Sequence, residues 1–171
     1  MATYVDRLID YNNWANQGLL DFLAGMPPET LDLTSAGVYG TIRETFEHLL
    51  SSEMGYCRRL ARAPVGDPPA RPEHPDLALL QSMATESAAR LVDLIDSLPE
   101  PATKIETRTG MRAAATILTQ LVMHGVEHRG HIGTILGANG IEPPDLDAWE
   151  HGIRVHGDDW PFDRGPEPES R

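Results

Sequence analysis

Three histidines share one face of a predicted helix in the last third of the chain. His124, His128 and His131 follow Ile117 and Leu121 at steps of three and four residues, so the five side chains lie on one face. An apolar stripe of this kind packs into a core, where an unpaired polar group costs roughly 1–3 kcal/mol. The imidazoles therefore need partners, and His124 and His128, one helical turn apart, can share one metal cation.

A third ligand has to reach this pair from elsewhere. His48 lies about two turns into a second predicted helix, on the flank of its apolar stripe with Thr45 and Ser52. Spacing alone does not choose between His48 and His131 as the third ligand. Either choice gives three neutral imidazoles, and three such ligands with a fourth position open are typical of catalytic zinc sites.

Glu53 and His131 are the candidates for catalytic roles beside a metal. Glu53 lies on the apolar stripe of the second helix, where its carboxylate could accept an imidazole N–H or pair with Arg129. His131 could support a ligand, take part in proton transfer, or be a core histidine with its own partner. Two further histidines, His151 and His156, lie near the C-terminal end and are expected at the surface.

Four amphipathic segments are long enough to position these side chains. Hydrophobic residues recur at helical spacing within residues 3–25, 41–63, 76–98 and 112–139, and proline or glycine follows each segment. Residues 103–107 could form one short extended piece, but no sheet is predicted. The core residues expected in the first segment are Val5, Leu8, Tyr11, Trp14 or Ala15, Leu19, Phe22 and Leu23. We therefore predict an all-α fold, a four-helix bundle.

The connection between the second and third segments indicates the topology. Residues 63–75 are rich in proline and long for a tight turn, so they could cross the bundle and let these two helices run parallel. The expected order is up-down-down-up. With 171 residues, the chain is predicted to form one domain over residues 1–156, followed by a flexible polar tail over residues 157–171.

Charge and composition exclude several classes of function. The chain has 14 Lys and Arg against 26 Asp and Glu, a net charge of −12, so we expect no binding to nucleic acid or to anionic membranes. Its single cysteine, Cys57, cannot form an internal disulfide and fits a core position better than a metal site. No apolar run is long enough to span a bilayer and no signal peptide is recognised, so a cytoplasmic location is predicted.

Four segments occur here in an order typical of one protein family. They are Tyr-Asn-Asn-Trp-Ala-Asn at 11–16, Ile-Arg-Glu-Thr-Phe-Glu-His at 42–48 with Glu53, His-Gly-Val-Glu-His-Arg-Gly-His at 124–131, and Gly-Ile-Glu-Pro-Pro-Asp-Leu-Asp at 140–147. Over about residues 3–150 the chain thus resembles the DinB/YfiT-like family of metalloenzymes. Relatives often carry Gln where this chain has His131, and His where it has Glu127.

The resemblance implies a fold and a set of ligands. The family fold is a four-helix bundle with parallel second and third helices. Its metal ligands are one histidine of the second helix and the His-x-x-x-His of the fourth, which here correspond to His48, His124 and His128. The resemblance therefore favours His48 over His131 as the third ligand.

The resemblance also implies a class of reaction. Related proteins include transferases and isomerases that use mycothiol, bacillithiol or glutathione, and homodimers are common among them. We expect a divalent metal ion, Zn²⁺ or alternatively Ni²⁺, and a metal-dependent S-transferase or isomerase that acts on a low-molecular-weight thiol and a small electrophile. The alternatives are a non-catalytic metal-binding or stress-response protein and a metal-dependent hydrolase.

Overall fold

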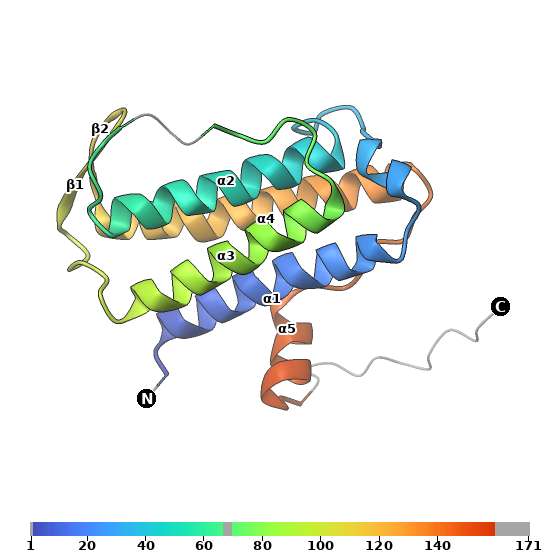
Figure 1. Cartoon of the computed structure of the whole chain (residues 1–171). Coiled ribbons are helices and arrows are strands. Elements are labelled where there is room, and N and C mark those ends of the chain that lie inside the picture. The colour runs from blue at the N-terminus through green and yellow to red at the C-terminus, as the bar shows by residue number, and fades with distance from the viewer. Residues whose placement is uncertain (1, 67–69, 160–171) are drawn as a thin grey trace.

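Four long helices pack into one bundle, as the sequence predicts. A computed structural model describes residues 2–66 and 70–159. The helices are α1 (Tyr4–Ala24), α2 (Ile42–Leu60), α3 (Leu77–Ile95) and α4 (Ala114–Ala138). In Figure 1, α1 and α4 run in one direction and α2 and α3 in the other. The up-down-down-up order is thereby confirmed, since α2 ends and α3 begins at opposite ends of the bundle.

Local capping interactions fix where the helices begin. Thr41 and Glu44 form a capping box at α2: the Thr41 hydroxyl accepts from the Glu44 N–H at 3.1 Å, and the Glu44 carboxylate accepts from the Thr41 N–H at 2.9 Å. Thr3 forms a second capping box at α1, and the Asp76 carboxylate caps α3. The first turn of α2, the helix that carries His48, is therefore defined by its own sequence.

Short elements connect and follow the long helices. They are the 3₁₀ turn η1 (Pro28–Asp32), the strands β1 (Lys104–Thr107) and β2 (Gly110–Ala113), the helix α5 (Ala148–His151) and the π-helical turn η2 (Gly152–His156). The two strands pair antiparallel at one end of the bundle (Figure 1). The expected extended piece at 103–107 is thus present, but the prediction of no sheet is wrong. The second strand has no buried residue, so it lacks a buried face to mark it in the sequence.

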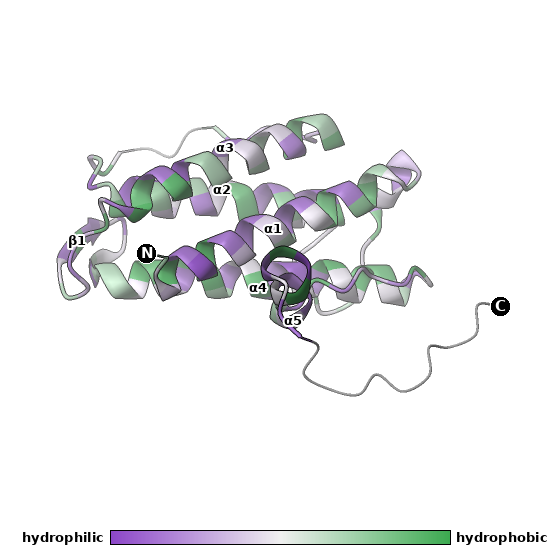
Figure 2. Ribbon diagram, turned by 90° about the horizontal axis from the view of Figure 1, so that it is seen from below, coloured by the Kyte–Doolittle hydropathy of each residue, from purple (hydrophilic) through white to green (hydrophobic). Residues whose placement is uncertain are grey.

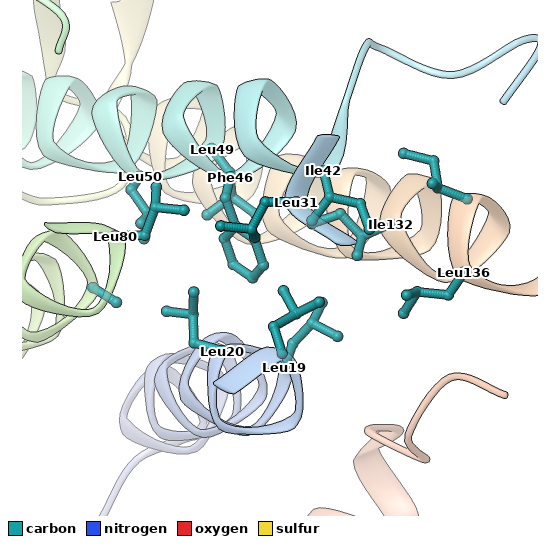
Figure 3. Close-up of a cluster of buried hydrophobic side chains, with 13 residues drawn as sticks. Leu19, Leu20, Leu31, Ile42, Phe46, Leu49, Leu50, Leu80, Ile132 and Leu136 are labelled. Carbon is teal, nitrogen blue, oxygen red and sulfur yellow. The ribbon is translucent and has the colours of Figure 1, made fainter. Parts of the chain in front are cut away.

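The apolar core has two clusters, one toward each end of the bundle. Figure 3 shows the cluster around Phe46 of α2, which points toward Leu19 and Leu20 of α1. The other cluster joins Ile9, Cys57, Leu60, Leu91, Leu94, Ile105, Ala114, Ile117 and Leu121. Cys57 is buried in this second cluster, as expected for a core residue.

Hydrophilic and hydrophobic residues are interspersed along α1. Figure 2 shows this mixture on α1 and places α5 against the side of the bundle near α1 and α4. Within the described ranges, none of the helices combines the length and the apolarity needed to cross a membrane. Most of the predicted tail, residues 160–171, lies outside the described residues.

Candidate metal centre

Three histidines from two helices bring their ring nitrogens together. His48 of α2 and His124 and His128 of α4 each direct Nε2 toward the same point. The Nε2 atoms of His48 and His124 lie 3.2 Å apart, and those of His124 and His128 lie 3.1 Å apart. The side chains that the family resemblance selects are therefore neighbours in space, although 76 residues of chain separate His48 from His124.

The spacing of these nitrogens fits a tetrahedral metal ion. Zinc binds imidazole nitrogen at about 2.0–2.1 Å, which separates two ligand atoms by about 3.3–3.4 Å. The observed separations of 3.2 and 3.1 Å are close to this value. Nitrogens that face one another in this way can all be satisfied by one shared cation. The donor set of three imidazoles is also one that zinc, nickel and copper accept readily.

Burial keeps the imidazoles in the form that binds metal. Burial, together with the neighbouring His128 and His48, lowers the pKa of His124 to about 4. Burial also lowers the pKa of His128 to about 4 and is the main reason that the pKa of His48 lies below its usual value. At neutral pH all three rings are therefore uncharged, and each carries its one lone pair on whichever ring nitrogen is not protonated.

The surroundings of the cluster include three side chains that sequence reasoning missed. Tyr39 stacks on His48, with ring centroids 4.3 Å apart, and Tyr56 meets His124 edge-on at 5.8 Å. Arg71 donates a hydrogen bond to Nδ1 of His48 at 3.0 Å. Tyr56, eight residues after His48 on the same helix, could have been found from helical spacing. The other two lie in loops, where spacing gives no such signal.

His131 lies beside the cluster and outside the group of three. Its ring is 5.3 Å from that of His128, centroid to centroid, and the two rings meet edge-to-face. Its Nδ1 is buried, and no hydrogen-bond partner for it occurs in the described residues. The structure therefore places this side chain next to His128 and outside the group of three.

Glu53 lies in a buried polar layer between the two apolar clusters. One carboxylate oxygen accepts from the amides of Asn12 (2.7 Å) and Asn16 (3.0 Å), and the other accepts from the Ser87 hydroxyl at 2.8 Å. Arg129 donates to the amide oxygens of the same two asparagines, at 2.9 and 2.7 Å. Of the two roles considered for Glu53, the link to Arg129 is thus present indirectly, through two shared amides, and every long helix contributes to the layer.

The C-terminal histidines differ from the sequence expectation. His151 is buried and not at the surface, because the rings of Tyr11 and Trp14 pack against it at 5.8 and 5.2 Å. His156 is partly buried beside it. Sequence reasoning missed this because contacts between α1 and the segment after α4 have no local pattern.

A cavity of about 300 Å³ lies on the other face of α4 from the three histidines. Its lining includes Tyr11, Val126, Arg129, Gly133 and Leu146. The Tyr11 hydroxyl donates to the Leu146 carbonyl at 3.1 Å and holds the segment that follows α4 in place. None of the three histidines lines this cavity, so the three-histidine cluster and the cavity are separate features.

Comparison with known proteins shows which family the chain belongs to. The DinB family profile matches residues 1–154. Protein DinB of Bacillus subtilis (strain 168) is 22% identical over 159 residues, a match that covers 86% of this chain and 92% of the relative. The crystal structure of a DinB-like protein from Bacillus subtilis superposes with a TM-score of 0.60 at 15% identity, covering 82% of this chain and 97% of the other. With its four-helix bundle and a profile match over nearly all of its length, this chain belongs to the DinB family.

Proposed function

We propose that this protein is a metal-dependent enzyme that joins a low-molecular-weight thiol to a small electrophile or isomerises a thiol adduct. The observation that carries the proposal is the convergence of three neutral imidazoles, His48, His124 and His128, on one point. Zn²⁺ is the preferred metal and Ni²⁺ the alternative, because both bind imidazole nitrogen strongly.

The three proposed ligands differ in their exposure to solvent, and this difference suits a site that a substrate can enter. His124 and His128 are buried and fixed on α4, whereas His48 is partly exposed beneath the half-exposed ring of Tyr39. A fourth ligand can therefore approach from the side of His48. A divalent cation at this site would lower the pKa of a thiol that it coordinates, which provides a nucleophile at neutral pH.

The first test measures the metal content of the protein. Wild type should retain close to one divalent cation per chain at the three-histidine cluster. His124→Ala and His128→Ala should each lose tight binding, because a site with two imidazoles is incomplete. His131→Ala serves as the matched control, since it removes an imidazole from the same face of α4. A His128→Ala variant with its full affinity would contradict the ligand assignment.

The second test addresses the thiol. The Co²⁺-loaded protein should develop a sulfur-to-metal charge-transfer band when mycothiol, bacillithiol or glutathione is added. Addition of that thiol to a generic electrophile should be accelerated, and the rate should disappear after chelation and in His48→Ala. A metal-loaded protein without spectral change or activity toward these thiols would favour a non-catalytic metal-binding role. Thiol-independent ester or amide cleavage would favour a hydrolase.

We also propose that the protein is a homodimer. Several apolar side chains remain exposed on the outer faces of α1 and α4 and on α5, among them Leu8, Met123, Val126 and Trp149. A second copy could cover such residues. Sedimentation equilibrium should give twice the chain mass, and a monomer at micromolar concentration would contradict this proposal.

A further inference from the structure

A second group of metal-binding side chains lies where the C-terminal segment meets α1. Asp10 comes from α1, His151 from the end of α5 and His156 from η2. The Asp10 carboxylate oxygen Oδ2 is 3.4 Å from Nε2 of His151 and 3.3 Å from Nε2 of His156. The two imidazoles are nearly perpendicular, with centroids 4.8 Å apart. Three donor atoms from separate elements thus face a common point.

His151 gives a second, independent indication of a ligand. Its side chain is only 6% exposed, and its buried Nε2 has no hydrogen-bond partner among the described residues. The aromatic rings of Tyr11 and Trp14 pack against the imidazole and limit its rotation. An unpartnered buried nitrogen is costly, and this one faces the Asp10 carboxylate. A cation between the two groups would satisfy both.

We propose that Asp10, His151 and His156 form a second binding site for a divalent transition-metal ion and thereby fasten the α5–η2 segment to α1. One carboxylate oxygen and two imidazole nitrogens are a ligand set that suits Zn²⁺. The site is separate from the three-histidine cluster, because the two groups share no residue. It is not needed for the function proposed above, and the two can fail independently.

Arg7 competes with the cation at this second site. Its guanidinium nitrogen Nη1 lies 2.6 Å from Nδ1 and 2.8 Å from Nε2 of His156. The guanidinium thus lies against both ring nitrogens of His156, including Nε2, the atom that faces Asp10. Arg7 is exposed near the start of α1 and can leave the imidazole. A cation that binds between His156 and Asp10 therefore has to displace Arg7.

The experiment counts metal equivalents in the full-length protein after chelator treatment. Zn²⁺ is titrated against a competing chromophoric chelator. Wild type should take up two equivalents, and Asp10→Asn and His156→Gln should each take up one. Asp21→Asn is the matched control, because it removes the same charge from an exposed position of α1, and it should retain two. His48→Ala should lose the other equivalent, so failure of one site is distinguishable from failure of the other.

Two further results decide the proposal. Arg7→Gln should bind the second equivalent severalfold more tightly, because a competing donor and a positive charge are removed. Zn²⁺ should slow tryptic cleavage after Arg154, which lies between the two histidine ligands, in wild type but not in Asp10→Asn. A titration that stops at one equivalent in wild type and in Arg7→Gln would overturn the proposal. So would a second equivalent that persists in Asp10→Asn. The contacts of Arg7, His156 and Asp10 would then be a network of charged and polar groups without a metal.

Discussion

Arg71 is the charged side chain closest to the three-histidine cluster, and its contact with His48 opposes metal binding. Its hydrogen bond to Nδ1 places the His48 proton on Nε2, the atom that faces the other two rings. Glu47 offers Arg71 an alternative partner at 3.4 Å. The guanidinium can therefore move to this carboxylate when a cation binds.

Replacement of Arg71 should strengthen metal binding. Removing one positive charge beside a divalent cation is worth on the order of 1 kcal/mol in a partly exposed site. We therefore expect Arg71→Gln to lower the Zn²⁺ dissociation constant about fivefold in a chelator competition titration. Arg112→Gln, which changes the same charge in the hairpin at the end of the bundle, should have no effect. Weaker binding in Arg71→Gln would show that Arg71 supports the site.

Cys57 should be unreactive while the protein is folded. Burial, together with the nearby Glu53, raises the pKa of its thiol to about 12. Between pH 9 and pH 12 the unfolded chain releases a proton that the folded chain keeps, so this group lowers the free energy of unfolding as the pH rises through that range. At pH 8 we expect alkylation by iodoacetamide to be at least about a hundredfold slower in native protein than in denatured protein. Similar rates would show that Cys57 is accessible.

The four long helices meet in a polar layer halfway along the bundle, and this layer fixes their relative positions. Glu53 of α2 accepts hydrogen bonds from α1 and α3, while Arg129 of α4 donates to α1. Burial lowers the pKa of Arg129, although Tyr11 and Glu53 oppose the shift. The charges of Glu53 and Arg129 compensate each other through the shared asparagines. Removal of either side chain would therefore leave the other as a buried charge without a counter-charge.

Removal of Glu53 should therefore destabilise the bundle strongly. We expect Glu53→Ala to lower the free energy of unfolding by about 3–5 kcal/mol in a urea titration, because Arg129 would remain buried without a counter-charge. Glu86→Ala is the control, since Glu86 forms an exposed ion pair with Arg90 on α3, and its loss should cost less than about 1 kcal/mol. A stable Glu53→Ala variant that loses its metal would instead assign Glu53 to the metal site.

At the scale of the whole molecule, the net charge of −12 sets which partners can approach. A surface of this sign repels the phosphate backbone. We expect duplex DNA to bind with a dissociation constant no lower than roughly 10⁻⁴ M at physiological salt. Fluorescence anisotropy with a labelled duplex measures this directly. Micromolar binding that weakens with added salt would reveal a basic surface and reopen a role on nucleic acid.

The sequence by itself determined the four long helices and the placement of His124 and His128 on one face of α4. The spacing of His124 and His128 follows from the pitch of one helix, and Thr41 and Glu44 mark where α2 begins. The long connection after α2 indicated that α2 and α3 run parallel. These features depend on residues close together in the chain, where hydrogen bonding within a helix fixes the geometry.

The tertiary structure decided which groups meet across helices. In α1 the expected core residue Leu8 is 48% exposed, whereas Asn12 and Asn16 are buried, because amides on that face bind Glu53 and Arg129. The burial of His151 likewise depends on contacts between distant segments. Such contacts depend on how each helix is rotated and shifted against its neighbours, and helical spacing carries no information about that.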